Sequence, residues 1–180
     1  MIRLFVGLEL PEAIRNALSA LEIGLPGAHW VPEENLHLTL RFIGDVDEGE
    51  ANDFHDALTG VRAPGFKLTV AGTGVFETGQ RPHTLWAAVN KCEALVRLQG
   101  KVESALVRAG CGREGRKFTP HITLARVRGT SMERLQPVLT ALALVRAEAP
   151  IDHFTLFSSQ LGSGDPLYTP EAEYPLMPTT

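Results

Sequence analysis

Two short stretches of this chain carry the residue types best suited to acid–base chemistry. They are HLTL at His37–Leu40 and HITL at His121–Leu124, and both read His-x-Thr-Leu. An unperturbed imidazole titrates near pH ~6.5, so one histidine of a pair can hold a proton while the other accepts one. A threonine two residues later offers a hydroxyl to an anion between the rings. The set suits in-line displacement at phosphorus, in which one histidine activates water and the other protonates the departing ribose oxygen.

The motifs are expected to lie on strands, where successive side chains point to opposite faces. His37, Thr39 and Arg41 then share one face, and His121 and Thr123 share the equivalent face of the second strand. The apolar residues on the other faces are Leu38, Leu40 and Phe42 in the first strand and Ile122 and Leu124 in the second. These apolar residues can pack against helices, which leaves both His-Thr pairs facing a shared cleft. Nearby arginines would offset the charge of a phosphodiester by bidentate contacts.

Other kinds of catalytic site fit these residues less well. A catalytic zinc normally has a third protein ligand, and neither motif brings a carboxylate or thiol at close spacing. We therefore expect no metal and no cofactor. A serine nucleophile is also disfavoured, because the chain has no Gly-x-Ser-x-Gly motif. The stretch GTG at Gly72–Gly74 lacks the ending of a phosphate-binding loop and is better interpreted as a bulge in a strand.

A third match to the motif, HFTL at His153–Leu156, tests this interpretation. It falls on the last expected strand of its half, whereas the corresponding strand of the first half, FKLTV, has no histidine. His153 is therefore expected to be a structural strand residue. The remaining histidines, His29, His55 and His83, have no partner pattern and are expected to be structural or exposed. Trp30 and Trp86 are expected in the core or where the lobes meet.

The order of secondary structure is expected to occur twice. In the first half the expected elements are a strand over 3–10, a helix from Pro11 to about residue 25, a strand over 37–44, a helix over about 48–60 and a strand over 66–76. In the second half they are a strand over 84–90, a helix over about 91–109, a strand over 117–127, a helix over about 132–146 and a strand over 151–161. Apolar residues at helical spacing and flanking Gly and Pro residues mark these elements. Residues 168–176 contain prolines and are expected to form an extra edge strand.

These elements predict one two-lobed domain over 1–180, with internal β-α-β-α-β pseudo-repeats at about 1–80 and 81–180. The two motifs fall on corresponding strands of the repeats. A duplicated unit places equivalent strands about a pseudo-two-fold axis, so the two histidines can face each other.

The composition is that of an ordinary globular protein, with 44% hydrophobic residues, 21% charged residues and a formal charge of −4. This charge disfavours binding of long nucleic acid through a broad basic surface, although a nucleic-acid end remains compatible. Basic residues do cluster around the second motif, at Arg113, Arg116, Lys117, Arg126 and Arg128. Two lone cysteines, the lack of a signal peptide and the lack of an apolar run of about 18 residues predict a cytoplasmic protein without a membrane span.

The chain resembles the two-histidine phosphoesterases and, within them, the bacterial and archaeal RNA 2',3'-cyclic phosphodiesterases, which are also called 2'-5' RNA ligases. The resemblance covers nearly the whole chain. It comprises RLFVGLELP, WVPEENLHLTLRFIGD, GTGVF with LWAAV, KFTPHITLARV, FTLFSSQL and YTPEAEYPL. It implies a bilobal α+β fold with mainly antiparallel sheets flanking a central cleft, and metal-free hydrolysis of a terminal 2',3'-cyclic phosphate to a 2'-phosphate.

The resemblance also implies roles for individual residues. His37 corresponds to the proton donor to the leaving 3' oxygen, and His121 to the acceptor that activates water. Thr39 and Thr123 would hold the phosphate. Arg126 resembles the arginine beside the phosphate, and because strict alternation puts it opposite His121, a bulge near Ala125 is required. Arg41 is a second candidate for substrate binding.

Three functions compete at this point. The leading one is hydrolysis of 2',3'-cyclic phosphate on RNA 3' ends or nucleotides, by a monomeric enzyme. The second is reversible 2'-5' RNA ligation at the same site. The third is an RNA-end or nucleotide binding module without turnover, which the intact motifs disfavour because a pure binder needs no pair of proton-transfer groups.

Overall fold

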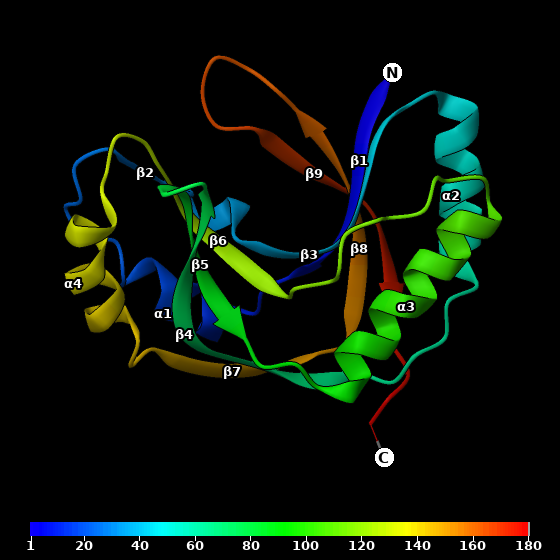
Figure 1. The fold of residues 1–180 in the computed structure, drawn as a ribbon. Coiled ribbons are helices and arrows are strands. Elements are labelled where there is room, and N and C mark those ends of the chain that lie inside the picture. Colours follow the sequence, from blue (N-terminus) through cyan, green and yellow to red (C-terminus); the bar gives the residue numbers. More distant parts are fainter. Residues whose placement is uncertain (180) are drawn as a thin grey trace.

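Two antiparallel β-sheets form the frame of the computed structural model, which describes residues 1–179 (Figure 1). The strands are β1 (Ile2–Glu9), β2 (Ala28–Trp30), β3 (His37–Val46), β4 (Phe66–Thr78), β5 (Arg81–Val89), β6 (His121–Val127), β7 (Arg146–Ile151), β8 (His153–Gln160) and β9 (Leu167–Pro175). The helices are α1 (Glu12–Ser19), the short 3-10 helix η1 (Glu33–Asn35), α2 (Glu48–Thr59), α3 (Glu93–Arg108) and α4 (Met132–Leu142). The predicted α+β class with antiparallel sheets is confirmed.

Each sheet combines strands from both halves of the chain. Sheet A has the strand order β3-β1-β8-β9, and sheet B has the order β2-β6-β5-β4-β7. The third strand of each expected repeat, β4 in the first half and β8 in the second, therefore lies in the sheet built by the other half. The strands and helices expected in both halves are present, with β2 added in the first half and β7 in the second, and the two sheets do not coincide with residues 1–80 and 81–180.

The helices cover the outer faces of the sheets and leave the inner faces to each other. Helices α2 and α3 pack together against sheet A, α1 packs against β7, and α4 packs against β4. Figure 1 shows α2 and α3 on one side of the molecule and α1 and α4 on the other. The start of α2 is well defined, because Asp47 and Glu50 form a capping box, with both hydrogen bonds at 2.9 Å. Within the described residues, no helix is long and apolar enough to cross a membrane.

The apolar residues of the two motifs belong to the core, as their alternation predicts. The exposed fractions are 0% for Leu38, 3% for Leu40, 0% for Ile122 and 2% for Leu124. Burying an aliphatic side chain of this size stabilises a protein by about 1.5–3 kcal/mol. The packing of these four residues against the helices therefore determines which face of β3 and β6 is turned toward the other sheet.

Several boundaries differ from the sequence predictions. Helix α1 ends at Ser19, whereas the sequence predicted an end near residue 25. Gly24, Pro26 and Gly27, which do not favour a helix, follow shortly after Ser19. The helix predicted over 132–146 ends at Leu142, because Arg146–Ile151 forms β7, a strand that was not predicted. This segment, RAEAPI, has little intrinsic preference for a strand and is held by pairing with β4. The predicted edge strand is confirmed, since β9 is the last strand of sheet A.

The lack of a side chain at Gly74 is required by close packing between β4 and β5. Gly74 is paired with Trp86, and a Cβ atom at Gly74 would lie 2.3 Å from Cζ2 of the indole. We expect Gly74→Ala to lower the free energy of unfolding by about 1–3 kcal/mol, since overpacking forces the ring or the strand to move. Urea denaturation followed by circular dichroism measures this change.

Gly100→Ala is the matched control. Gly100 lies inside α3, and a Cβ atom there meets nothing within 4 Å. Alanine is favoured over glycine in a helix by roughly 0.5–1 kcal/mol, so this variant should be more stable than the wild type. Equal stability of Gly74→Ala and the wild type would show that the indole moves away at no cost.

Candidate active site

His37 is the first residue of β3, and both of its ring nitrogens have partners. Nδ1 lies 2.7 Å from the carbonyl oxygen of Asn35, and Nε2 lies 3.0 Å from the hydroxyl of Thr39. A carbonyl oxygen only accepts hydrogen bonds, so Nδ1 must carry the proton. In neutral His37, Nε2 is therefore the basic nitrogen, and it points along the strand toward Thr39.

His121 is the first residue of β6 and is held in the same way. Its Nδ1 lies 2.7 Å from the carbonyl oxygen of Thr119, again the residue two positions earlier. The same reasoning places the proton on Nδ1 and leaves Nε2 as the nitrogen that can exchange protons. The two predicted catalytic histidines thus share one tautomer, one kind of backbone anchor and one position in their strands.

Aromatic side chains pack against both imidazole rings. The centroid of the His37 ring lies 4.9 Å from that of Phe5 and 5.1 Å from that of Tyr168. The centroid of the His121 ring lies 4.9 Å from that of Phe76 and 6.1 Å from that of Trp86. These contacts limit the movement of the two rings.

The two motif strands carry the same β-bulge. On β3, Thr39 pairs with Gly7 and Arg41 with Val6, so Leu40 is the additional residue. On β6, Thr123 pairs with Trp86 and Ala125 with Leu85, so Leu124 is the additional residue. A bulge of this kind places two consecutive side chains on one face and reverses the alternation after it.

The bulges determine which arginine lies on the histidine face. The bulge predicted near Ala125 is confirmed, and beyond it Arg126 is exposed while Ala125 is buried. The predicted placement of Arg41 on the face of His37 and Thr39 is wrong, because the equivalent bulge in β3 was not anticipated. Arg41 is 6% exposed and turned inward, and the next residue, Phe42, is 46% exposed.

Arg41 binds the segment that leads to the second motif. Its Nε donates to the carboxylate of Glu103, and its Nη1 and Nη2 donate to the carbonyls of Phe42 and Gly112. Glu103 also accepts a hydrogen bond from the backbone of Glu114 at 3.0 Å. Most donors of Arg41 are therefore engaged within the protein, which fits a residue that positions the loop. Its predicted contact with substrate stays a prediction.

Arg126 is exposed on β6, in the sheet opposite Tyr168. Burial raises the pKa of Tyr168, and the positive charge of Arg126 partly offsets this rise. Tyr168 in turn contacts the His37 ring edge-to-face. The contact of Arg126 with a phosphate stays a prediction.

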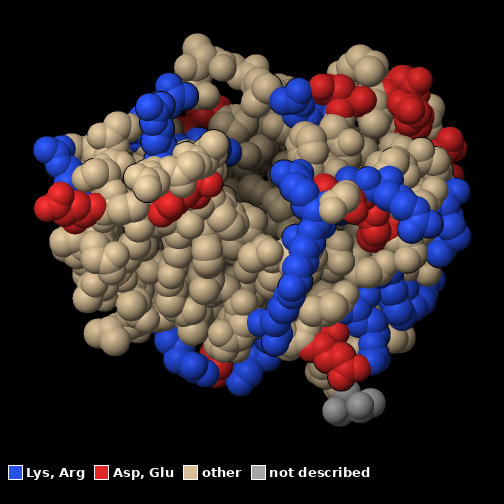
Figure 2. Space-filling model, in the orientation of Figure 1, with Lys and Arg blue, Asp and Glu red and all other residues tan. Residues whose placement is uncertain are grey.

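The two histidines line two different cavities, and the hydrogen-bonded residues His37 and Thr39 line one cavity each. A cavity of about 230 Å³ is lined by His37, Tyr168 and Glu9, among others. A second, of about 450 Å³, is lined by Thr39, His121 and Phe76, together with Arg116 and Lys117. Strands β3 and β6 lie next to each other between them. Figure 2 shows a hollow near the middle of the face turned toward the viewer, with Lys and Arg side chains beside the hollow.

The protonation of His37 reflects its surroundings. Burial is the main cause that lowers the pKa of His37; the hydrogen bond to the Asn35 carbonyl opposes it, and the charge of His121 lowers it further. The two histidines begin strands β3 and β6, which lie next to each other. In the free protein the buried ring favours the neutral form, and a bound anion would reverse this preference.

The other predicted residues are placed as follows. Thr123 is half-buried on β6, two residues after His121, as Thr39 is after His37. His83, which was expected to be structural or exposed, is exposed and lines the larger cavity. Tyr168 was not predicted, and nothing in the sequence of an edge strand marks it. The aromatic pair Phe5 and Trp86 could have been found by aligning RLFVG with TLWAA, the first strands of the two halves.

Comparison with solved structures defines the class of protein. A crystal structure of a phosphoesterase superposes with a TM-score of 0.80 at 27% identity, covering 97% of this chain and 98% of that one. The structure of LigT from Escherichia coli in complex with 3'-AMP superposes with a TM-score of 0.78 at 28% identity, covering 97% and 98% of the two chains. The fold is that of these phosphoesterases.

The sequence profile of the 2'-5' RNA ligase superfamily matches residues 10–162, and the chain belongs to this superfamily. The RNA 2',3'-cyclic phosphodiesterase of Thermotoga maritima is 32% identical over 173 residues, covering 93% of this chain and 91% of that protein. The protein of the same name from Thermus thermophilus is 36% identical over 180 residues, covering 93% and 87%.

The environment of His37 predicts its titration. In the free protein, the Cε1 proton signal of His37 should titrate with a midpoint below ~6.5, because burial disfavours the imidazolium. Addition of inorganic phosphate should raise the midpoint, since an anion beside the ring favours the charged form. NMR titration measures both midpoints, and the signal is assigned by its loss in His37→Gln. A midpoint above 6.5 without phosphate contradicts this prediction.

Proposed function

We propose that this protein hydrolyses the 2',3'-cyclic phosphate of RNA 3' ends or nucleotides to a 2'-phosphomonoester, with His37 and His121 as its acid and base. The observation that carries the proposal is the matched anchoring of the two histidines. Each donates Nδ1–H to a carbonyl at 2.7 Å, each lines a cavity of its own, and the strands that they begin, β3 and β6, lie next to each other. The proposed reaction needs one imidazole that accepts a proton from water and another that donates a proton to the leaving oxygen, and both rings are fixed by the same kind of hydrogen bond.

The relatives support the choice of substrate. Proteins named RNA 2',3'-cyclic phosphodiesterase from Thermotoga maritima and Thermus thermophilus align with 93% of this chain. The structure of LigT with 3'-AMP, which superposes over 97% of this chain, is the complex of a protein of this fold with a ribonucleotide. A cavity of about 450 Å³ beside His121 is large enough for part of a nucleotide.

His121 is the proposed base in the first half of the reaction. Its Nδ1 proton is held by the Thr119 carbonyl, so Nε2 has the lone pair that accepts a proton from water. The water oxygen then forms a bond to phosphorus as its proton moves to Nε2. The Thr119 hydrogen bond stabilises the imidazolium that results, because a carbonyl oxygen accepts more strongly from a charged donor.

His37 is the proposed acid in the second half. Its Nε2 proton passes to the 3' oxygen as the bond between that oxygen and phosphorus breaks, which leaves the phosphate on the 2' oxygen. The free protein holds His37 in its neutral form more readily than an exposed histidine, since burial lowers its pKa. The negative charge of the bound phosphodiester must therefore favour the protonated form of His37, so substrate binding is coupled to proton uptake at this residue.

Thr39, Thr123 and Arg126 are the proposed groups that bind the phosphate. The Thr39 hydroxyl lies 3.0 Å from Nε2 of His37, so an oxygen of the phosphate can accept from either of them. Arg126 is exposed, and its guanidinium can donate two parallel hydrogen bonds to phosphate oxygens. A monomeric state and a cytoplasmic location stay predictions.

Removing either histidine should abolish most of the hydrolysis. We expect His37→Ala and His121→Ala each to lower kcat for 2',3'-cyclic AMP by about 10²–10⁴-fold, the range of a single proton-transfer group. Treatment of the wild type with EDTA should leave the rate unchanged, because the two imidazoles and two hydroxyls complete the proposed site. Phosphorus NMR follows the reaction and distinguishes a 2'- from a 3'-monophosphate.

His55→Gln is the control for this experiment. His55 lies on α2 and bonds to Tyr174 at 2.8 Å, on the outer side of sheet A. It should retain the wild-type rate. Full activity in either His37→Ala or His121→Ala rejects the mechanism, and a dominant 2'-5' linked product from RNA halves would favour ligation over hydrolysis.

Arg126 offers a test of how the phosphate is held. We expect Arg126→Ala to lower kcat/KM by about 10–100-fold, since a hydrogen bond to a charged group contributes about 1.5–3 kcal/mol. Arg128→Ala is matched in charge and lies just beyond β6, so it should change kcat/KM by less than about twofold. Steady-state kinetics on both variants measures the difference. An equal loss of kcat/KM in the two variants would mean that Arg126 contributes only its positive charge and makes no specific contact with the phosphate.

A further inference from the structure

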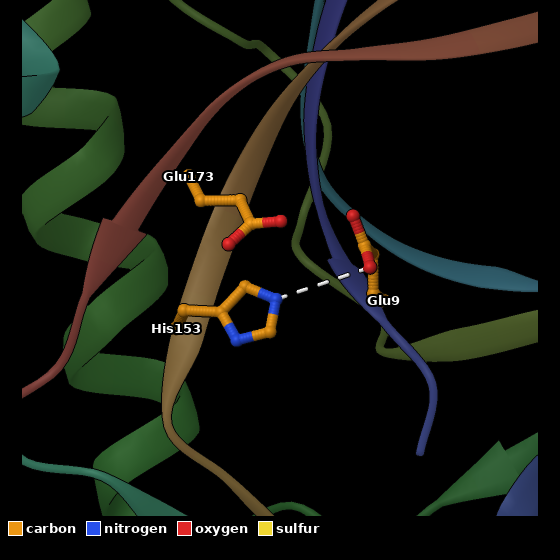
Figure 3. Close-up of side chains that lie close together, drawn as sticks. All are labelled: Glu9, His153 and Glu173. Atoms are coloured by element: carbon orange, nitrogen blue, oxygen red, sulfur yellow. Dashed lines mark ion pairs between the residues drawn. The ribbon is translucent and has the colours of Figure 1, made fainter. Parts of the chain in front are cut away.

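Three metal-ligating side chains gather on sheet A, and one of them, Glu9, also lines the smaller cavity beside His37. They are Glu9 at the end of β1, His153 at the start of β8 and Glu173 near the end of β9. One ligand atom from each residue lies within 4.8 Å of the others. Figure 3 shows His153 directed toward Glu9, with the Glu173 carboxylate above the imidazole ring. The register explains the grouping, because β1, β8 and β9 are consecutive neighbours in the sheet.

The orientation of the imidazole is determined by a group outside the cluster. Nδ1 of His153 lies 2.6 Å from the carboxylate of Asp152, which can only accept, so Nδ1 carries a proton. Nε2 is then turned toward Glu9 and Glu173. A carboxylate bound to the far nitrogen of an imidazole is the arrangement that commonly supports a metal-ligating histidine.

Nε2 of His153 is buried and has no hydrogen-bond partner among the described residues. Its nearest acidic oxygen, Oε2 of Glu9, is 4.0 Å away, which is too long for a hydrogen bond. A protonated His153 that served the two carboxylates would be expected to hydrogen-bond one of them, and here it does not. The gap between Nε2 and the oxygens instead suits a third atom between them.

Glu9 is oriented in the same sense. Its Oε1 accepts a hydrogen bond of 3.4 Å from the hydroxyl of Thr155, which leaves Oε2 facing His153. Within residues 1–179, no lysine or arginine nitrogen lies within 4.0 Å of the carboxylates of Glu9 or Glu173. Among the described residues, these two carboxylates therefore have no lysine or arginine partner to balance their charge.

We propose that Glu9, His153 and Glu173 bind a divalent transition-metal ion, with Zn²⁺ as the best-fitting ion. One imidazole nitrogen and two carboxylate oxygens form a three-ligand protein site that leaves a fourth position for water. Ligand atoms bonded to one zinc ion at about 2.0–2.2 Å lie roughly 3–4 Å apart. The ligand atoms already lie within 4.8 Å of one another, and Glu173 is exposed, so a rotation of its side chain would bring the cluster to these distances.

The site would connect three strands by one ion. Its ligands come from the central strands β1 and β8 and from the edge strand β9, which carries Tyr168 against His37. Binding would therefore stabilise the attachment of β9 to the sheet. The proposed acid and base, His37 and His121, contribute no ligand to this cluster, although Glu9 lines the same cavity as His37. Zinc binding can therefore be tested separately from hydrolysis.

Zinc binding to variants tests the proposal directly. The protein is treated with EDTA, dialysed into metal-free buffer at pH 7 and titrated with ZnCl₂ by calorimetry. The wild type should bind one Zn²⁺ per chain at this site. Glu173→Gln and His153→Asn should each bind it at least tenfold more weakly, since each loses one of three ligands. Zn²⁺ should also raise the Tm of the wild type and raise it less in both variants.

Glu171→Gln is the matched control on the same strand. It removes the same charge as Glu173→Gln, and the new amide oxygen can still accept the hydrogen bond from Ser158. Its Zn²⁺ affinity and Tm rise should equal those of the wild type. Unchanged affinity in Glu173→Gln, or no stoichiometric binding by the wild type, overturns the proposal. Glu173 is exposed, so its variant gives a decisive result even where His153→Asn fails to fold.

Discussion

Two backbone carbonyls, those of Asn35 and Thr119, determine which nitrogen each histidine presents to the cleft. Each accepts the Nδ1 proton of a histidine two residues later at 2.7 Å. Without that acceptor either nitrogen could carry the proton, and the ring could rotate about its bond to the strand. The other contacts act on rings that these carbonyls already orient. Aromatic side chains limit the movement of both rings, and the Thr39 hydroxyl lies beside Nε2 of His37.

Both halves of the chain are needed to form the candidate active site, because each sheet contains strands from both halves. Sheet A needs β8 from the second half, and sheet B needs β4 from the first, so neither half can complete the sheet that holds its own motif. Arg41 adds a link of the same kind, because it joins β3 to Glu103 on α3 and to the loop before His121. Disturbing one half of the chain should therefore disturb both histidines.

The sequence predicted those features that depend on local pattern. The strands of both motifs, their buried leucines and the helices α2 and α3 follow from alternation and helical spacing, and β9 follows from its prolines. The bulge near Ala125 was predicted only because Arg126 required it. Its counterpart at Leu40 was missed, and Arg41 was placed on the wrong face as a result. Strand β7, the exchange of β4 and β8 and the position of Tyr168 depend on pairing between distant residues, which no short pattern encodes.

The roles proposed for the two histidines are opposite, although both rings have the same backbone anchor. Both rings have a carbonyl at Nδ1, so that hydrogen bond cannot distinguish an acid from a base. Burial lowers the pKa of His37, so burial alone disfavours the protonated form that an acid requires. An acid that is loaded only when an anion is present is useful for a phosphodiester, because it stays neutral and keeps the cavity free of a buried charge until substrate arrives. The substrate itself then supplies the difference between the two imidazoles.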